Sequence, residues 1–542
     1  MLKGLEIPQG KRTPLYRFLE ILPGFISYSA IILLFLLSWL NPVLGAIYLF
    51  TLISATLVKA IGVAYRTVQG ARVIERAERV NWRKRVEDLA NPHDAYERLV
   101  GTNNKSYHFT EHLMNLKMLA TSMDLSYPKP SQIYHVVIMT AYNEGIEVLD
   151  PSIKAVEDTT FPNDHIIFVL AYEERGGEDI EKTAKTLQKK YRHTFKTFLL
   201  SKHPANLRGE VVGKGPNLTY AGQEVACYVE EHKLPVENTI VTSLDSDNHM
   251  HPKYLDSVAY EFIVNPSRQH LSYQPVSLFT NNIWDAPAPT RVVAVSNSFF
   301  NVITTMRPHV LRNFASHSQP LQALKSMDFW SKRTIVEDGH QYWRSLFFFD
   351  GDYSVFPIRI PIYQDAVMDE SFWKTVKAQF IQVRRWYYGA SDVAYVGSRL
   401  FVSKSKRDVP FWQLFPKFLR LLDGHITLAI MAPIITFGAW VPMIMNAASH
   451  DMVTYNLPNI VSIIETIACI GLFITILVSF RLLPKRPAKY RKGRSLLMVL
   501  QWILMPVVSI LYQSIAAYYA QTRLMLGLYM EKFDVTKKVI KK

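Results

Sequence analysis

The chain has 542 residues, 49% of them hydrophobic, and a formal net charge of +15. So apolar and so basic a composition is unusual for a soluble globular protein, and it points to nucleic acid, an anionic membrane surface or anionic substrates as partners. The length allows two or three domains, and the widely separated Cys227 and Cys469 exclude a disulfide framework and zinc-ligand spacing.

Two apolar stretches near the N-terminus predict a transmembrane hairpin within residues 1–65. Residues 22–40 contain no charge, and residues 42–65 contain only Lys59. Each can cross a hydrocarbon core, which needs about 20 residues, and Asn41-Pro42 supplies the turn. Two buried core helices are the alternative, but charge-free runs of this length are rare in soluble proteins.

Basic residues flank this hairpin on both sides, so we expect both of its ends to be cytoplasmic. The same rule argues against nucleic acid as a partner, because the positive charge follows the membrane flanks. The next segment, residues 66–130, is expected to be cytosolic or interfacial. Within it, residues 66–100 predict one amphipathic helix near the membrane surface.

Residues 131–408 predict a soluble α/β domain. Apolar runs over 134–139, 165–170 and 239–244 alternate with helical patterns such as 179–191. Short buried strands separated by helices predict a mostly parallel sheet flanked by helices. Ligands bind outside the carboxyl ends of the strands in such sheets, so polar residues at those ends are candidates for chemistry.

The membrane pattern returns in residues 409–530. Residues 411–423 predict an interfacial helix, and 426–447 and 459–480 predict spans. The connection 448–458 lacks Lys and Arg, whereas 481–494 carries seven, so we expect the first outside and the second inside.

The last apolar stretch conflicts with the basic tail, residues 531–542. A single crossing by residues 495–519 would place that tail outside, whereas its lysines favour the cytoplasm. A break at Pro506 would allow two short helices to enter and return.

Two carboxylates follow the third buried strand. Asp245 and Asp247 can hold a hard divalent cation, Mg²⁺ or Mn²⁺, which would neutralise a diphosphate. His249 is near enough to be a further ligand, although a solvated turn histidine is the simpler interpretation. Asp pairs at this spacing are common on surfaces, and the apolar strand before them is what makes this pair informative.

A lysine lies between two glycines ahead of the apolar run 239–244. Gly213 and Gly215 would let the backbone near Lys214 approach phosphate oxygens closely. The spacing is not that of a P-loop. A lysine on a flexible turn is the alternative.

Two further motifs lie after residue 330. Glu337-Asp338 can supply a general base whose neighbour perturbs its pKa, although acids are also favoured in the first turn of a helix. Gln382, Arg385 and Trp386 share one face of a helix predicted over 372–390. An amide and an arginine can grip a diphosphate, and an indole can stack on a sugar or simply pack the helix.

The order of these motifs between membrane segments resembles the family 2 glycosyltransferases of the GT-A fold, in their membrane-integrated branch with cellulose, chitin and hyaluronan synthases. The resemblance covers roughly residues 130–400 and the transmembrane layout. It implies that the α/β domain is a GT-A catalytic domain embedded between N- and C-terminal transmembrane helices.

The resemblance also implies a role for each motif. Tyr142, Asn143 and Glu144 would border the base and ribose, with Glu173 or Glu174 where the family more often has Asp. Lys214 would contact phosphate, Asp245 would lie near the nucleotide, and Asp247 would be the main metal ligand. Asp338 would be the general base beside Glu337, with Val336 where Thr is usual. Gln382 and Arg385 would bind the diphosphate and Trp386 the acceptor sugar, and residues 533–538 would cover the site.

The implied function is inverting transfer from a nucleoside-diphosphate sugar to a hydroxyl acceptor. We expect an integral membrane protein, in the plasma membrane, with its catalytic domain in the cytosol and processive polysaccharide synthesis as its activity. One alternative is transfer of one sugar to a lipid carrier or glycolipid. Others are a transporter with a cytosolic nucleotide-binding module, for which Lys59 and Glu465 are candidate intramembrane charges, and an inactive sugar-binding scaffold.

Overall fold

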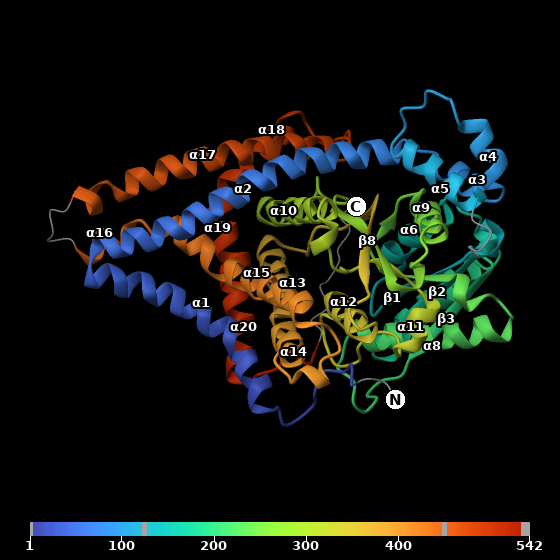
Figure 1. The fold of residues 1–542 in the computed structure, drawn as a ribbon, viewed down its shortest axis with the longest axis horizontal. Coiled ribbons are helices and arrows are strands. Elements are labelled where there is room, and N and C mark those ends of the chain that lie inside the picture. The colour runs from blue at the N-terminus through green and yellow to red at the C-terminus, as the bar shows by residue number, and fades with distance from the viewer. Residues whose placement is uncertain (1–3, 122–126, 447–451, 533–542) are drawn as a thin grey trace.

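The computed structural model describes residues 4–121, 127–446 and 452–532, and within them the chain forms an eight-stranded sheet of order β3-β2-β1-β4-β7-β6-β8-β5. Figure 1 shows the sheet and its flanking helices on one side of the molecule and the long helices α1, α2 and α17 extending to the other. The strands are β1 (Tyr134–Ala141), β2 (Ile166–Glu173), β3 (Thr197–His203), β4 (Thr239–Asp245), β5 (His249–Met250), β6 (Leu271–Phe279), β7 (His317–Pro320) and β8 (Ser354–Gln364).

One half of the sheet follows the sequence prediction. The three predicted strands are β1, β2 and β4, and β1 pairs in parallel with both of the others, while β3 extends the parallel order beyond β2. The other half departs from the predicted parallel order at β7 and β5. There β6 pairs in parallel with β8, but β7 runs antiparallel to β4 and β6, and β5 runs antiparallel to β8, so the sheet is mixed.

The antiparallel strand β7 escaped prediction because it has no apolar run. Its sequence is His317-Ser318-Gln319-Pro320, and all four residues are buried. Side-chain hydrogen bonds hold this strand in place: Ser318 Oγ lies 2.8 Å from Thr242 Oγ1 and 2.9 Å from the hydroxyl of Tyr254. A buried polar strand of this kind depends on partners distant in the sequence.

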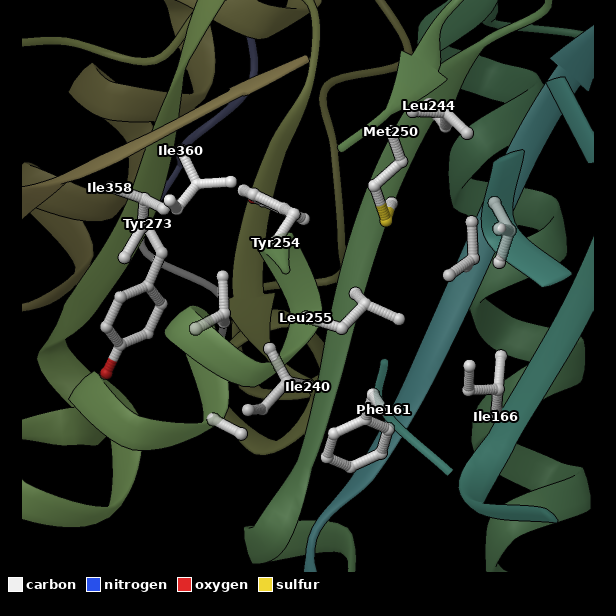
Figure 2. Packing of buried hydrophobic residues seen from close by; sticks show 14 of the residues in the cluster. Phe161, Ile166, Ile240, Leu244, Met250, Tyr254, Leu255, Tyr273, Ile358 and Ile360 are labelled. Carbon is white, nitrogen blue, oxygen red and sulfur yellow. The ribbon is translucent and has the colours of Figure 1, made fainter. Parts of the chain in front are cut away.

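Helices cover both faces of the parallel half. Alternate residues of β1, such as Val136 and Ile138, pack on one face against α8, whereas Val137 and Met139 pack on the other. Burial on both faces explains why these strands are continuous apolar runs. Figure 2 shows part of the second core, with Ile240 of β4 near Leu255 of α9 and Leu244 of β4 near Met250 of β5. The helices are α6 (Ile146–Glu157), α7 (Gly177–Lys190), α8 (Lys214–Glu231), α9 (Tyr254–Val264), α10 (Ala288–Thr305), α11 (Leu321–Ser326), α12 (Glu337–Phe348), α13 (Phe372–Tyr387) and α14 (Ser391–Leu400).

The N-terminal hairpin forms as predicted, with longer helices. It consists of α1 (Pro14–Leu40) and α2 (Pro42–Glu78), and the side chain of Asn41 caps α2 by accepting a hydrogen bond from Val43 N at 2.8 Å. The prediction of one helix over 66–100 is wrong. The chain breaks after α2 into α3 (Trp82–Asp88) and α4 (Pro92–Leu99), because the side chain of Asn81 caps α3 and Pro92 favours a new helix start at α4. A fifth helix, α5 (Phe109–Thr121), follows them.

The C-terminal half begins with one long helix where two were predicted. Residues 411–423 and the first part of the predicted span 426–447 belong to α15 (Phe411–Phe437), and α16 (Trp440–Met445) follows it. The predicted span 459–480 lies within α17 (Met452–Leu482), which packs along α2. Residues 448–451 of the predicted external connection, and residues 533–542 with the proposed cover of the site, lie outside the described residues.

The last apolar stretch bends and returns to the sheet domain. It comprises α18 (Gly493–Leu500), a 3₁₀ turn (Gln501–Leu504), α19 (Met505–Ser509), a π-helical turn (Ile510–Ile515) and α20 (Ala516–Leu526). The break lies at the 3₁₀ turn, and Pro506 stands in the first turn of α19, where its missing N–H costs nothing.

Contacts at both ends of this stretch fix its course. Before it, Arg494 donates to the carbonyl oxygen of Trp284 at 2.7 Å. Beyond it, Met530 N donates to the hydroxyl of Tyr388 at 3.1 Å. Midway, the hydroxyl of Tyr518 donates to Ser27 O near the middle of α1. The stretch therefore starts and ends on the same side as the sheet domain.

Four helical stretches of the described chain are long and apolar enough to cross a membrane: Pro14–Leu40, Pro42–Glu78, Phe411–Phe437 and Gly493–Leu526. The first two agree with predicted spans, and the third overlaps the predicted span 426–447 only over residues 426–437. The fourth has the length and composition of a span, but both of its ends contact the sheet domain.

The returning course of residues 493–526 can be tested by labelling cysteines in sealed vesicles. Exposed Cys227 on the sheet domain provides an internal reference. We expect cysteines introduced by Lys492→Cys and Leu528→Cys to react with an impermeant thiol reagent from the same side as Cys227. Met445→Cys, at the far end of the hairpins, is the control and should react from the opposite side. Labelling of positions 492 and 528 from opposite sides would contradict the returning course.

Candidate active site

One cavity of about 490 Å³ gathers most of the residues selected from the sequence. It lies at the carboxyl ends of the parallel strands, where a sheet of this kind binds ligands. Asn143 and His249 are not among the lining residues. Those that line it are Tyr142, Glu144, Glu173, Lys214, Asp245, Asp247, Glu337, Asp338, Gln382, Arg385 and Trp386.

The register of β1 against β4 brings two of the motifs together. Thr140 is paired with Asp245, so the loops that follow the two strands start side by side. Glu144 joins them: it accepts hydrogen bonds from the backbone N–H of Tyr142 at 2.7 Å and from Ser246 Oγ at 3.0 Å. Its carboxylate is therefore already engaged in shaping the loop.

Strand β2 ends at Glu173, and Glu173 and Glu174 have different surroundings. Glu173 is buried, lines the cavity and forms an ion pair with Arg175, whose guanidinium carbon lies 5.2 Å from the ring centroid of Tyr142. Glu174 instead accepts a hydrogen bond from Ala205 N at 2.9 Å. Of the two candidates for the base-contacting acid, Glu173 is the one at the cavity.

Lys214 is the first residue of α8 and contacts two acidic side chains. Its Nζ lies 2.5 Å from Asp245 Oδ1 and 3.8 Å from Glu337 Oε1, and it also donates to Ala315 O at 3.0 Å. Burial disfavours its charge, but Asp245, Glu337 and Asp338 outweigh this and raise the pKa of Lys214. The lysine is thus a fixed cation in the cavity.

Gly215 allows this close approach. A Cβ at this position would lie 2.4 Å from the carbonyl oxygen of Ser331 and 3.1 Å from Glu337 Cβ. Only glycine lets the start of α8 pack directly against the residues before α12. The N-terminus of α8, the positive end of its dipole, consequently lies at the cavity wall, where it favours an anion such as phosphate.

Glu337 and Asp338 form the first turn of α12, so both interpretations of this pair apply. Glu337 is 4% exposed, and burial, with the negative charge of Asp338 as the second cause, raises its pKa to about 8. Burial also raises the pKa of Asp338, although Lys214 and Arg385 oppose this. A raised pKa makes the carboxylate of Asp338 a stronger proton acceptor, as a general base requires, whereas Glu337 already holds a proton at neutral pH.

The helix α13 presents Gln382, Arg385 and Trp386 to the cavity, as its spacing predicted. Gln382 Oε1 accepts a hydrogen bond from Gln379 Nε2 at 3.0 Å, and the indole of Trp386 lies 6.0 Å from the ring of Phe279. The face that was expected to bind ligand therefore does reach the cavity, and Trp386 also packs the helix.

Two of the three proposed metal ligands lie at the cavity. Asp245 and Asp247 both line the cavity, and His249 on β5 does not, while burial lowers the pKa of its imidazole. The described residues contain no group of three or more His, Cys, Asp or Glu side chains able to hold a metal ion. Two carboxylates nevertheless fit the way in which Mg²⁺ is usually held, by one or two acids and the phosphates of a substrate.

Several cavity residues carried no sequence signal. They come from α10 and the loop after it, from α14, and from the apolar helices, and include Asn297, Arg312, Asp392, His425, Leu428, Val508 and Tyr512. Asp365 also lines the cavity. It follows strand β8 directly, so its place at a strand end could have identified it.

No family model and no curated protein matches this chain. Solved structures similar to it include the mannosyltransferase PcManGT from Pyrobaculum calidifontis in complex with GDP-Man and Mn²⁺, at 13% identity and a TM-score of 0.38, covering 81% of this chain and 99% of that one. Residues 1–349 of S. aureus TarS in complex with UDP are 12% identical with a TM-score of 0.35, covering 74% of this chain and 94% of that one. These scores are too low to assign the fold or activity of either protein to this chain.

The raised pKa of Glu337 predicts a pH-dependent stability. Between its ordinary pKa of 4.5 and its value of about 8 in the folded protein, the folded form keeps a proton that the unfolded form has lost. Stability therefore falls as pH rises through this range. Glu337→Gln cannot ionise, so it should gain stability over wild type from pH 5 to pH 8, on the order of a few kcal/mol.

Thermal unfolding midpoints of both proteins in detergent at pH 5 and pH 8 measure this gain. Glu231→Gln is the matched control, because Glu231 is exposed at the far end of α8. A difference between wild type and Glu337→Gln that is the same at both pH values would show that Glu337 is already ionised at pH 5.

Proposed function

We propose that this chain is an inverting glycosyltransferase that moves a sugar from a nucleoside-diphosphate sugar to a hydroxyl acceptor. The observation that carries this proposal is the arrangement of Lys214 against Asp245 and Glu337 in one cavity with Asp338, Arg385 and Trp386. The cavity combines fixed positive groups for a diphosphate, buried acids for proton transfer and an indole for a sugar ring.

In the proposed reaction Asp338 accepts the proton of the acceptor hydroxyl as that oxygen attacks the anomeric carbon. The bond from this carbon to the diphosphate breaks, and the diphosphate leaves with the bonding electrons. Lys214, Arg385 and the N-terminus of α8 stabilise its charge. Attack opposite the leaving group inverts the configuration, and one carboxylate base is sufficient for this course.

A divalent cation fits the two carboxylates at the end of β4. When bound, Mg²⁺ or Mn²⁺ neutralises charge on the diphosphate as a Lewis acid. Asp247 would be its main ligand, with Asp245 near the nucleotide, where Lys214 already contacts it. Tyr142, Asn143, Glu144 and Glu173 would border the base and ribose.

The proposal includes a GT-A type catalytic domain over residues 131–408, of family 2, between membrane helices. The domain would lie in the cytosol on the inner face of the plasma membrane, since basic residues flank the hairpins on its side. Gln382, Arg385 and Trp386 favour processive polysaccharide synthesis, as in the synthases that the sequence resembles.

Lys59, one candidate for the intramembrane charge of a transporter, instead pairs with Asp423 at 3.2 Å.

A second candidate, transfer to a lipid-linked acceptor, is favoured by one observation. The cavity continues from the sheet domain between apolar helices, where Leu428 of α15 and Val508 of α19 line it. A lipid chain could lie against such residues while its head reaches the acids.

Replacement of the proposed base tests the reaction. Asp338→Asn should lower the rate of sugar transfer by about 10²–10⁴, because the acceptor hydroxyl loses its proton acceptor. Nucleotide affinity should be retained. Released nucleoside diphosphate, from a panel of nucleotide sugars incubated with the purified protein and Mn²⁺, measures the rate. Asp179→Asn, exposed on α7, is the control, and a variant at 338 with wild-type turnover would exclude Asp338 as the base.

Removal of the metal tests the role of Asp247. We expect chelation to abolish turnover and added Mg²⁺ or Mn²⁺ to restore it, because the diphosphate loses its neutralising charge. Asp247→Asn should require a metal concentration at least about 10-fold higher for half-maximal turnover, since it loses a charged ligand. Full activity after exhaustive chelation would contradict a metal requirement.

A further inference from the structure

Arg312 places an uncompensated positive charge inside the cavity. It follows the short 3₁₀ turn Pro308–Val310, lines the cavity, and its guanidinium carbon lies 5.8 Å from the ring centroid of buried Trp343. Across the described part of the chain, no hydrogen bond or ion pair engages its guanidinium. Arginine stays protonated in proteins, so this charge persists.

The carboxylate that faces Arg312 is already occupied. Asp392 lines the same part of the cavity, but its Oδ1 lies 2.6 Å from Nδ1 of fully buried His340. Burial lowers the pKa of Arg312, and Asp392 only partly opposes this. A partly buried guanidinium is stabilised by an anion that binds beside it.

More arginines extend this charge towards the apolar helices. Burial lowers the pKa of Arg307, and the charges of Arg66 on α2 and Arg420 on α15 lower it further. The charge of Arg420 also lowers the pKa of Arg312. Arg66, Arg307 and Arg420 have no ion pair among the residues that the structure describes. The acid nearby on α15, Asp423, is paired with Lys59. The junction of α2, α15 and the loop after α10 therefore carries net positive charge.

Apolar side chains also line this part of the cavity. Leu428 of α15, Met505 and Val508 of α19, and exposed Phe300 of α10 line it. The α15 and α19 residues belong to stretches apolar enough for a bilayer. The cavity thus offers acids to a hydroxyl, a guanidinium to an anion and an apolar wall to a hydrocarbon chain.

We propose that the acceptor is a sugar linked through phosphate to a lipid: the sugar hydroxyl reaches Asp338, the phosphate group binds Arg312, and the lipid chain lies between α15 and α19. This inference rests on the proposed glycosyl transfer and specifies its acceptor. Arginine pairs with phosphate oxygens through two parallel hydrogen bonds, and the neighbouring arginines attract the same charge. A neutral sugar chain alone would leave this charge unmatched.

The test measures binding to the full-length protein in detergent. The probes are farnesyl phosphate, farnesol and inorganic phosphate, each titrated calorimetrically into wild type, Arg312→Gln, Arg312→Lys and Arg192→Gln. Arg192 is exposed beyond the end of α7 and serves as the matched control. Release of nucleoside diphosphate from nucleotide sugars by wild type is measured separately, so a failure of the proposed function is seen independently of lipid binding.

We expect farnesyl phosphate to bind wild type at least about 10-fold more tightly than farnesol or inorganic phosphate. Arg312→Gln should remove this advantage, Arg312→Lys should keep part of it because lysine remains a cation, and Arg192→Gln should bind like wild type. Equal binding of farnesol and farnesyl phosphate to wild type would overturn the proposal without any variant. Unchanged affinity in Arg312→Gln would overturn the role of Arg312, and equal binding of inorganic phosphate would overturn the lipid part.

Discussion

The contact of the Lys214 ammonium with Asp245 and Glu337 is the interaction on which the candidate site depends. It joins the end of β4, the start of α8 and the start of α12 at one point. The ammonium compensates the charge of Asp245, and a buried ammonium without an acidic neighbour would be costly. The three elements therefore stabilise one another only when all are in place, and the opening between them becomes the cavity.

Segments near both ends of the described chain contact the loops that lead into α8 and α12. Near the N-terminus, the carboxylate of Glu6 accepts a hydrogen bond from Ser331 at 2.7 Å and pairs with Arg344, which is buried on α12. Near the C-terminus, Glu531 O accepts a hydrogen bond from Val212 N at 3.1 Å, two residues before Lys214. The segments that precede and follow the apolar helices thus hold the loops before α12 and α8, which couples the membrane-like part to the site.

Parts of the fold and site with a local signal could be predicted, and parts with a non-local origin could not. The strands β1, β2 and β4 are apolar runs, and the helix α13 shows its ligand face through residue spacing. Polar β7 is stabilised by Ser318 bonding to Thr242 and Tyr254, which are remote in the sequence. In the same way, Arg312 and Asp392 belong to no motif and reach the cavity only because α10, α14 and α15 pack around it.

The sequence by itself determined the alternation of strands and helices, the apolar hairpins and the acids, lysine and helix face that line the cavity, because each of these is encoded by neighbouring residues. Only the tertiary structure decided the antiparallel pairings of β7 and β5, the return of residues 493–526 to the sheet domain and the choice of Glu173 over Glu174 at the cavity. These depend on hydrogen bonds and ion pairs between residues tens to hundreds of positions apart, and such pairings leave no periodic pattern in the chain.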